Sequence, residues 1–116
     1  MTTGISTSLS AWYDDEALIL SNTGTLTALQ VTITVQNTQG VSYDGISNNI
    51  GSQITMGHSG LVYTFTLASG KTVSAGTGRR FDAEISGSGT VHVATGDTWA
   101  ITYTTGGVNY QQSGNF

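Results

Sequence analysis

The segment Leu29-Gln-Val-Thr-Ile-Thr-Val-Gln36 alternates between apolar and polar side chains without a break. Successive side chains of a β-strand point to opposite faces, so one face of this segment is aliphatic and the other carries Gln and Thr. A strand with one apolar and one polar face belongs to a sheet that covers a core on one side and meets water on the other. The segment therefore predicts an antiparallel sheet packed on a core.

The same alternation recurs along the chain, with Gly- and Asn-containing turns between the segments. It is strongest over 61–67, 81–85 and 98–104, and the polar face of 81–85 carries charges of both signs. Shorter strands are expected within 17–21, 41–43, 53–56, 90–93 and 109–111. We expect one all-β domain spanning residues 1–116, an Ig-like or jelly-roll antiparallel β-sandwich of about eight to nine strands, rather than a single closed sheet.

Two groups of aromatic residues differ in their sequence context. The first group lies in phase with the aliphatic residues of the strongest strands, so we expect these rings in the core: Tyr63, Phe65, Phe81, Trp99 and Tyr103. The second group lies near turns or in polar, edge-like segments: Trp12, Tyr13, Tyr43 and Tyr110. Exposed flat rings can stack on the C–H face of a sugar, and the alternative is that they are half-buried at the sandwich edge.

Charge is scarce, with 3 Lys and Arg against 7 Asp and Glu and a formal net charge of −4. Nucleic acids and anionic membrane surfaces need several basic contacts, so neither is an expected partner. A surface of Thr, Ser, Gly, Asn and Gln suits a neutral ligand. Cysteine is absent, which excludes disulfides and thiolate metal sites. No apolar stretch approaches the roughly 20 residues that span a bilayer.

The first residues, Met1 to Thr7, lack the basic start and apolar run of a signal peptide. Met1 is therefore interpreted either as a start added to a module excised from a larger secreted protein or as the start of an intracellular protein. The first interpretation gives an extracellular location.

The only cluster of acidic residues is Asp14-Asp15-Glu16. We expect a solvated turn there, with a calcium site as the alternative, because hard cations take six or more oxygen ligands. Neighbouring acids point in different directions and make a poor general acid–base pair. The two histidines, His58 and His92, are expected on the surface, since a metal site would need them brought together with carboxylates. No Gly-x-Ser-x-Gly motif occurs, so we expect neither an enzyme nor a bound cofactor.

The segments Tyr63-Thr-Phe-Thr-Leu-Ala-Ser-Gly-Lys-Thr-Val-Ser-Ala-Gly-Thr-Gly78, Phe81-Asp-Ala83 and Gly96-Asp-Thr-Trp-Ala-Ile-Thr-Tyr103 carry a resemblance to a known family. They resemble bacterial carbohydrate-binding modules of the cellulose- and chitin-binding β-sandwich superfamily, in which a Gly-containing loop follows an apolar strand and a Trp strand closes the sheet. The resemblance implies a secreted, non-catalytic module, tethered to a glycoside hydrolase or scaffold, that binds a polysaccharide such as cellulose through exposed aromatic rings. The row of coplanar tryptophans typical of that family has no counterpart here.

The sequence thus predicts a polysaccharide-binding sandwich whose ligand-binding residues are Trp12, Tyr13, Tyr43 and Tyr110. The alternative is a structural or adhesion domain that contacts other protein chains through unpaired strand edges.

Overall fold

The computed structural model describes residues 1–116, and they form two antiparallel sheets packed face to face. The first sheet has the strand order β1-β2-β7-β4, and the second has the order β5-β6-β3-β8-β9. The all-β antiparallel sandwich expected from the sequence is confirmed. The strands are β1 (Thr2–Leu9), β2 (Tyr13–Asn22), β3 (Leu26–Thr34), β4 (Ser42–Asn48), β5 (Ile54–Ser59), β6 (Val62–Leu67), β7 (Gly76–Ser86), β8 (Thr98–Thr105) and β9 (Val108–Asn115).

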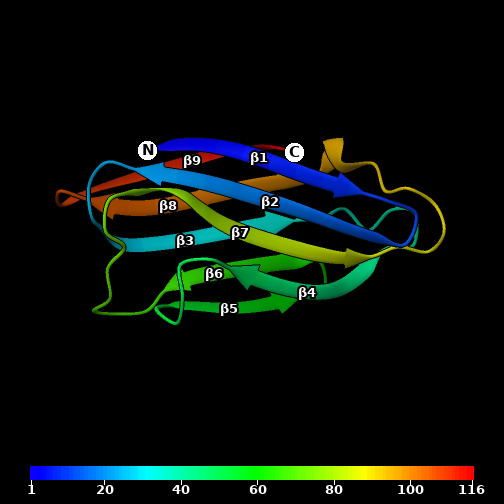
Figure 1. Ribbon diagram of the computed structural model, residues 1–116, viewed down its shortest axis with the longest axis horizontal. Coiled ribbons are helices and arrows are strands. Elements are labelled where there is room, and N and C mark those ends of the chain that lie inside the picture. The colour runs from blue at the N-terminus through cyan, green and yellow to red at the C-terminus, as the bar shows by residue number, and fades with distance from the viewer.

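Hairpins join β1 to β2, β5 to β6 and β8 to β9 within a sheet, and every other connection crosses between the sheets. The molecule is elongated, 46 Å long and 22 by 19 Å across. In Figure 1 the sheets form two layers, with β1 lying over β9 along one long side and β4 near β5 along the other. The loops after β1 and β7 meet at the same end of the long axis.

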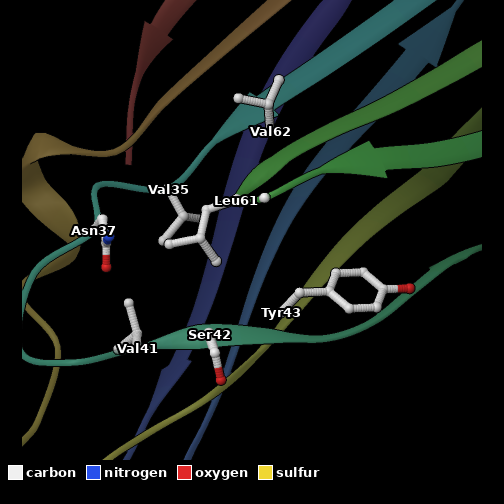
Figure 2. A pocket seen from close by; sticks show the side chains of 8 residues that line it. Val35, Asn37, Val41, Ser42, Tyr43, Leu61 and Val62 are labelled. Carbon is white, nitrogen blue, oxygen red and sulfur yellow. The ribbon is translucent and has the colours of Figure 1, made fainter.

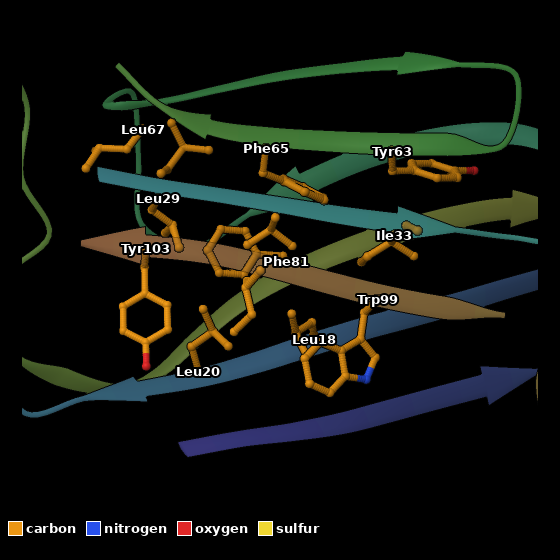
Figure 3. Close-up of a cluster of buried hydrophobic side chains, with 14 of the residues drawn as sticks. Leu18, Leu20, Leu29, Ile33, Tyr63, Phe65, Leu67, Phe81, Trp99 and Tyr103 are labelled. Atoms are coloured by element: carbon orange, nitrogen blue, oxygen red, sulfur yellow. The ribbon is translucent and has the colours of Figure 1, made fainter. Parts of the chain in front are cut away.

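Alternation in the strongest segments produces the core, as expected. Figure 3 shows the inward side chains of β3, β6, β7 and β8 meeting between the two sheets. Phe65 and Phe81 meet edge to face across the sheets, with ring centroids 5.2 Å apart. The five aromatic residues predicted to be internal are all buried: Tyr63, Phe65, Phe81, Trp99 and Tyr103.

The structure differs from the strands expected from the sequence at three places. Residues 2–9 form β1, whose polar sequence TTGISTSL carries little apolar signal because both faces of this edge strand are largely exposed. The short strand expected within 41–43 does not end there: it continues through a bulge at Asp44-Gly45 as β4, and a Cβ at Gly45 would come within 2.7 Å of the Glu84 carboxylate. Residues 90–93 belong to an irregular segment that runs from β7 to a single 3-10 turn, Ala94–Gly96.

Two consecutive glycines, Gly106 and Gly107, form the hairpin turn between β8 and β9. Gly106 and Gly107 both have positive φ, 59° and 76°. Two consecutive residues with positive φ form the type I′ turn that matches the twist of antiparallel strands, and glycine adopts this conformation without strain. The turn therefore fixes the register that pairs Tyr103 with Tyr110.

The two long sides of the sandwich differ in how well they are closed. On one side β4 and β5 come into contact, and Tyr43 and His58 stack in parallel with ring centroids 3.5 Å apart. On the other side β1 and β9 leave apolar side chains exposed, among them Ile5 at 46% and Val108 at 50%.

Candidate functional site

Three of the four aromatic residues predicted to bind a ligand gather at one end of the first sheet. Tyr13 on β2 pairs with Ser86 at the end of β7, and Ser42 on β4 pairs with the same serine from the other side. Neighbouring strands lie about 5 Å apart, so β2 and β4 are about 10 Å apart here. Trp12 and Tyr43, each next to one of these paired residues in the chain, therefore lie at the same end. We call this region, built from Trp12, Tyr13 and Tyr43, the aromatic end.

Trp12 is the most exposed large apolar residue of the molecule, at 71%. Two backbone hydrogen bonds nevertheless hold its loop in place. The N–H of Gly87 donates to the Trp12 carbonyl (2.8 Å), and the N–H of Gly89 donates to the Ala11 carbonyl (2.9 Å). The indole lies against Gly89, where a Cβ would come within 3.2 Å of the ring. A Cβ at Gly87 would lie 2.3 Å from the Ala11 carbonyl oxygen, so this close approach requires glycine.

Tyr13 lies on the outer face of β2, where its hydroxyl donates a hydrogen bond to Glu84 Oε1 at 2.9 Å. Partial burial, together with this hydrogen bond and the negative charge of Glu84, raises the pKa of Tyr13 well above its ordinary value. The same face carries Asp15. Burial, together with the neighbouring Asp82 carboxyl, raises the pKa of Asp15 to about 6. Arg80 partly balances these acids, with its Nε 2.8 Å from Asp82 Oδ1.

Tyr43 borders an open hollow of about 420 Å³ between the end of β3, the start of β4 and the turn from β5 to β6. Figure 2 shows Val35 and Leu61 on one side of the hollow and Val41 on the other. The Tyr43 ring extends away along its own strand, and His58 covers one face of that ring. Asn37 and Ser42 add polar groups to a mostly apolar lining.

Tyr110 is separate from the aromatic end. It is 45% exposed, and its ring stacks on Tyr103 with centroids 5.1 Å apart and an angle of 16° between the planes. It lies six residues before Phe116, whose N–H donates to the Asp97 carbonyl near the other end of β9. Six residues of extended strand span about 20 Å, so the structure does not bring Tyr110 to the other three rings.

A buried polar cluster lies within the sandwich near the aromatic end. It consists of Glu16 on β2, His92 in the segment after β7, and Asp97 immediately before β8, each at most 1% exposed. One ligand atom from each residue lies within 4.8 Å of the other two. We call these three residues the acid–histidine cluster.

This cluster corrects two expectations. Asp14, Asp15 and Glu16 do not form a solvated turn: they belong to β2, and the alternation of the strand turns Asp14 and Glu16 inward. Asp15 points to the opposite face, so the three acids cannot share one ion. His92 does not point outward. The segment turns His92 inward and leaves its two neighbours, Val91 and Val93, exposed at 51% and 58%.

Both nitrogens of the His92 ring are engaged. Nε2 lies 2.6 Å from Asp97 Oδ2, and Nδ1 lies 3.1 Å from the Thr38 hydroxyl. A hydroxyl, imidazole and carboxylate in series can activate a nucleophile. Here the Thr38 N–H, a candidate donor to a developing oxyanion, already donates to the Gln36 carbonyl at 2.8 Å. The contact between Thr38 and His92 ties the loop after β3 to the buried group formed by Glu16, His92 and Asp97.

Glu16 is the unsatisfied member of the cluster. Neither of its carboxyl oxygens has a hydrogen-bond partner that meets the usual geometry, and Oε2 lies 3.7 Å from His92 Nε2. Burial, followed by the neighbouring Asp97 carboxyl, raises the pKa of Glu16 far above its ordinary value. A buried carboxyl in this position holds a proton or meets a cation.

One sequence signal could have revealed the cluster. Asp14 and Glu16 are in phase with Leu18 and Leu20, two residues of the apolar run 17–20 that the structure buries in the core. The apolar pattern predicts this strand only within 17–21, so Asp14 and Glu16 fell outside it and their inward orientation was not predicted. The approach of His92 and Asp97 depends on the path of an irregular segment and has no signal in the sequence.

No helix of the structure is both long enough and apolar enough to cross a membrane. Comparison of the chain with models of protein families, with characterised proteins and with solved structures finds no match in any of the three.

Proposed function

We propose that this protein is a non-catalytic module that binds a neutral polysaccharide, such as cellulose, through the aromatic end. The observation that carries the proposal is Trp12, a ring exposed at 71% on a loop held by two backbone hydrogen bonds. The indole is thereby presented on an ordered loop, where its open face can stack on the C–H face of a sugar ring. Because the loop is already ordered, a ligand would lose little affinity in fixing it.

The surroundings of the ring favour a neutral, hydroxyl-rich ligand. Ser88 and Thr90 are exposed close to Trp12 in the loops that meet at this end, and Ser88, whose hydroxyl donates to the Gln39 carbonyl, can still accept a hydrogen bond. Such hydroxyls exchange hydrogen bonds with sugar hydroxyls, while the indole covers the C–H face of a sugar ring. The net charge of −4 disfavours anionic polymers.

Tyr13 and Tyr43 support the proposal to different degrees. Tyr13 is 40% exposed and its hydroxyl is already fixed by Glu84, so it offers a preorganised second ring. Tyr43 points toward the second sheet, where His58 covers one face of its ring, so it does not share a face with Tyr13 and contributes by bordering the hollow between β3 and β4. A module of this kind would act by raising the concentration of a tethered glycoside hydrolase or scaffold, in a secreted protein, on its polymer.

A pull-down on insoluble cellulose, chitin and xylan, with bound and free protein quantified, tests the proposal. We expect depletion on at least one polymer and at least a tenfold loss of affinity in Trp12→Ala. Tyr110→Ala is the matched control, because it removes an exposed ring far from Trp12, and it should bind as the wild type does. Absence of depletion on all three polymers, or equal losses in both variants, would count against the proposal.

Protein–protein assembly is a second candidate function, favoured by the incompletely closed side of the sandwich. The edge strands β1 and β9 both have free backbone groups, and they expose Ile5, Leu9, Val108 and Tyr110 at 37–50%. Light scattering after gel filtration distinguishes this function. An assembly domain would form oligomers that dissociate in Ile5→Lys, whereas the polysaccharide module would remain a monomer in both forms.

A further inference from the structure

We propose that Glu16, His92 and Asp97 form a binding site for a divalent transition-metal ion, of which Zn²⁺ is the representative. The three side chains come from separate parts of the chain and converge within the sandwich, with a ligand atom of each inside 4.8 Å of the others. This proposal is independent of the polysaccharide function, because none of the three residues contacts solvent at the aromatic end.

Unsatisfied oxygen atoms at the centre of the cluster point to a ligand. Glu16 is fully buried, and neither Oε1 nor Oε2 accepts a hydrogen bond from an N–H or O–H group, so in the metal-free protein only a proton shared with the neighbouring Asp97 carboxyl would satisfy it. Asp14, the neighbouring inward residue of β2, is also fully buried and has one unpaired oxygen, Oδ2, which brings the number of unpaired carboxyl oxygens on this face to three. Buried carboxyl oxygens without partners are rare in folded proteins, since removal from water without a compensating contact is strongly unfavourable. A dication would provide that contact.

Charge and ligand type narrow the choice of ion. The carboxylates of Glu16 and Asp97 balance a charge of +2, and neutral His92 adds a nitrogen ligand. One imidazole and two carboxylates suit Zn²⁺ and similar ions, whereas Ca²⁺ takes oxygen ligands in greater number. This set differs from the calcium site that three consecutive acids suggested, because it uses one of those acids and two residues distant in sequence.

The distances require only a local adjustment. Ligand atoms about 2.1 Å from a tetrahedral ion lie about 3.4 Å from one another. His92 Nε2 is now 2.6 Å from Asp97 Oδ2 and 3.7 Å from Glu16 Oε2. Metal binding would therefore separate the first pair by somewhat less than 1 Å and bring the second pair slightly closer. A water molecule would complete the fourth position.

The surrounding hydrogen bonds already orient the ligands. Asp97 Oδ1 accepts the Gln36 N–H at 2.7 Å, which leaves Oδ2 for the ion. His92 Nδ1 faces the Thr38 hydroxyl, which can accept an Nδ1–H once Nε2 gives up its proton to bind the metal. Outer contacts of this kind are typical of protein metal sites, where they fix the tautomer and the ring orientation.

Metal-binding calorimetry and thermal unfolding of the untagged, EDTA-treated protein test the proposal, with ZnSO₄ as the probe and CaCl₂ for comparison. We expect one Zn²⁺ per chain. At a free concentration of 100 times Kd, zinc should raise the Tm by roughly 10 °C. Calcium should cause no comparable shift. With Co²⁺ in place of zinc, visible absorption should show a low-symmetry, histidine- and oxygen-ligated ion.

Glu16→Gln should weaken zinc binding at least 100-fold, and Asp97→Asn provides a second variant if the first does not fold. His58→Gln is the matched control: it removes the other histidine, which lies exposed on β5, and should retain full binding. The proposal is wrong if the folded wild-type protein binds no zinc. It is equally wrong if Glu16→Gln binds zinc as tightly as wild type, or if His58→Gln loses it.

Discussion

The inner face of β2 has an apolar half and an acidic half, and the two are equally buried. Leu18 and Leu20 face the core, and Leu18 is the register partner of Phe81 on the neighbouring strand β7. Asp14 and Glu16 continue the same face toward the aromatic end and are just as inaccessible. Alternation along the strand therefore dictates which residues point inward, but it does not dictate what they meet there.

The two halves are stabilised in different ways. The apolar half gains from removal of hydrocarbon from water, an effect that needs no particular partner and tolerates shifts in position. The acidic half depends on specific atoms, the His92 imidazole and the Gln36 N–H at Asp97, and leaves Glu16 without a hydrogen bond. The apolar half is therefore stabilised by burial alone, whereas the acidic half depends on the particular partners of each of its atoms.

Leu18→Ala should have the largest effect on stability. Removal of a fully buried leucine side chain loses its transfer free energy and leaves a cavity, so the free energy of unfolding should fall by about 4 kcal/mol. Urea unfolding followed by tryptophan fluorescence measures this change. Ile19→Ala, on the outer face of the same strand, should cost only about 1 kcal/mol. Equal losses in the two variants would show that the two faces of β2 do not differ in burial.

Asp97→Ala should rank second, with a loss of about 3 kcal/mol in metal-free buffer. It removes the acceptor of two short hydrogen bonds and leaves the Gln36 N–H and the His92 ring without that partner. Chemical unfolding in EDTA, with circular dichroism as the probe, measures the change. A loss below about 1 kcal/mol would mean that water replaces the carboxylate at the cluster and that the acidic half is hydrated.

Glu16→Gln should change stability in the opposite direction. In the metal-free protein at neutral pH, folding requires the buried Glu16 carboxyl to take up a proton, and glutamine avoids this cost. We expect the free energy of unfolding to rise by about 1 kcal/mol in EDTA, because the unpaired amide offsets part of the gain. A decrease in the same buffer would show that the Glu16 carboxylate has a favourable partner in the folded state without metal.

The core and the positions of its strongest strands along the chain could be predicted from the sequence, because their signals are local. The alternation over 29–36 and the Gly106-Gly107 turn each specify a conformation through neighbouring residues alone. β1 escaped prediction for a physical reason. As an edge strand exposed on both faces it needs no apolar pattern, and it forms through backbone pairing with β2.

The candidate site was only partly predictable. An exposed Trp12 follows from its position in a polar turn, but its proximity to Tyr43 arises because β7 lies between β2 and β4, and no local pattern encodes that strand order. The acid–histidine cluster combines residues up to 81 positions apart, and His92 reaches it from a segment without regular structure. Prediction from one sequence fails where contacts depend on crossings between sheets.

Trp12→Ala should have the smallest effect on stability, a change of less than about 0.5 kcal/mol in the free energy of unfolding. The ring is 71% exposed, and the hydrogen bonds that hold its loop come from backbone atoms, which alanine retains. Thermal unfolding of wild type and variant in the same buffer measures this difference. A loss above about 1.5 kcal/mol would indicate that the indole stabilises the loop by packing on Gly89. In that case its exposure would have a structural cause, and the contrast between the stabilising core of the sandwich and a ligand-binding end would no longer hold.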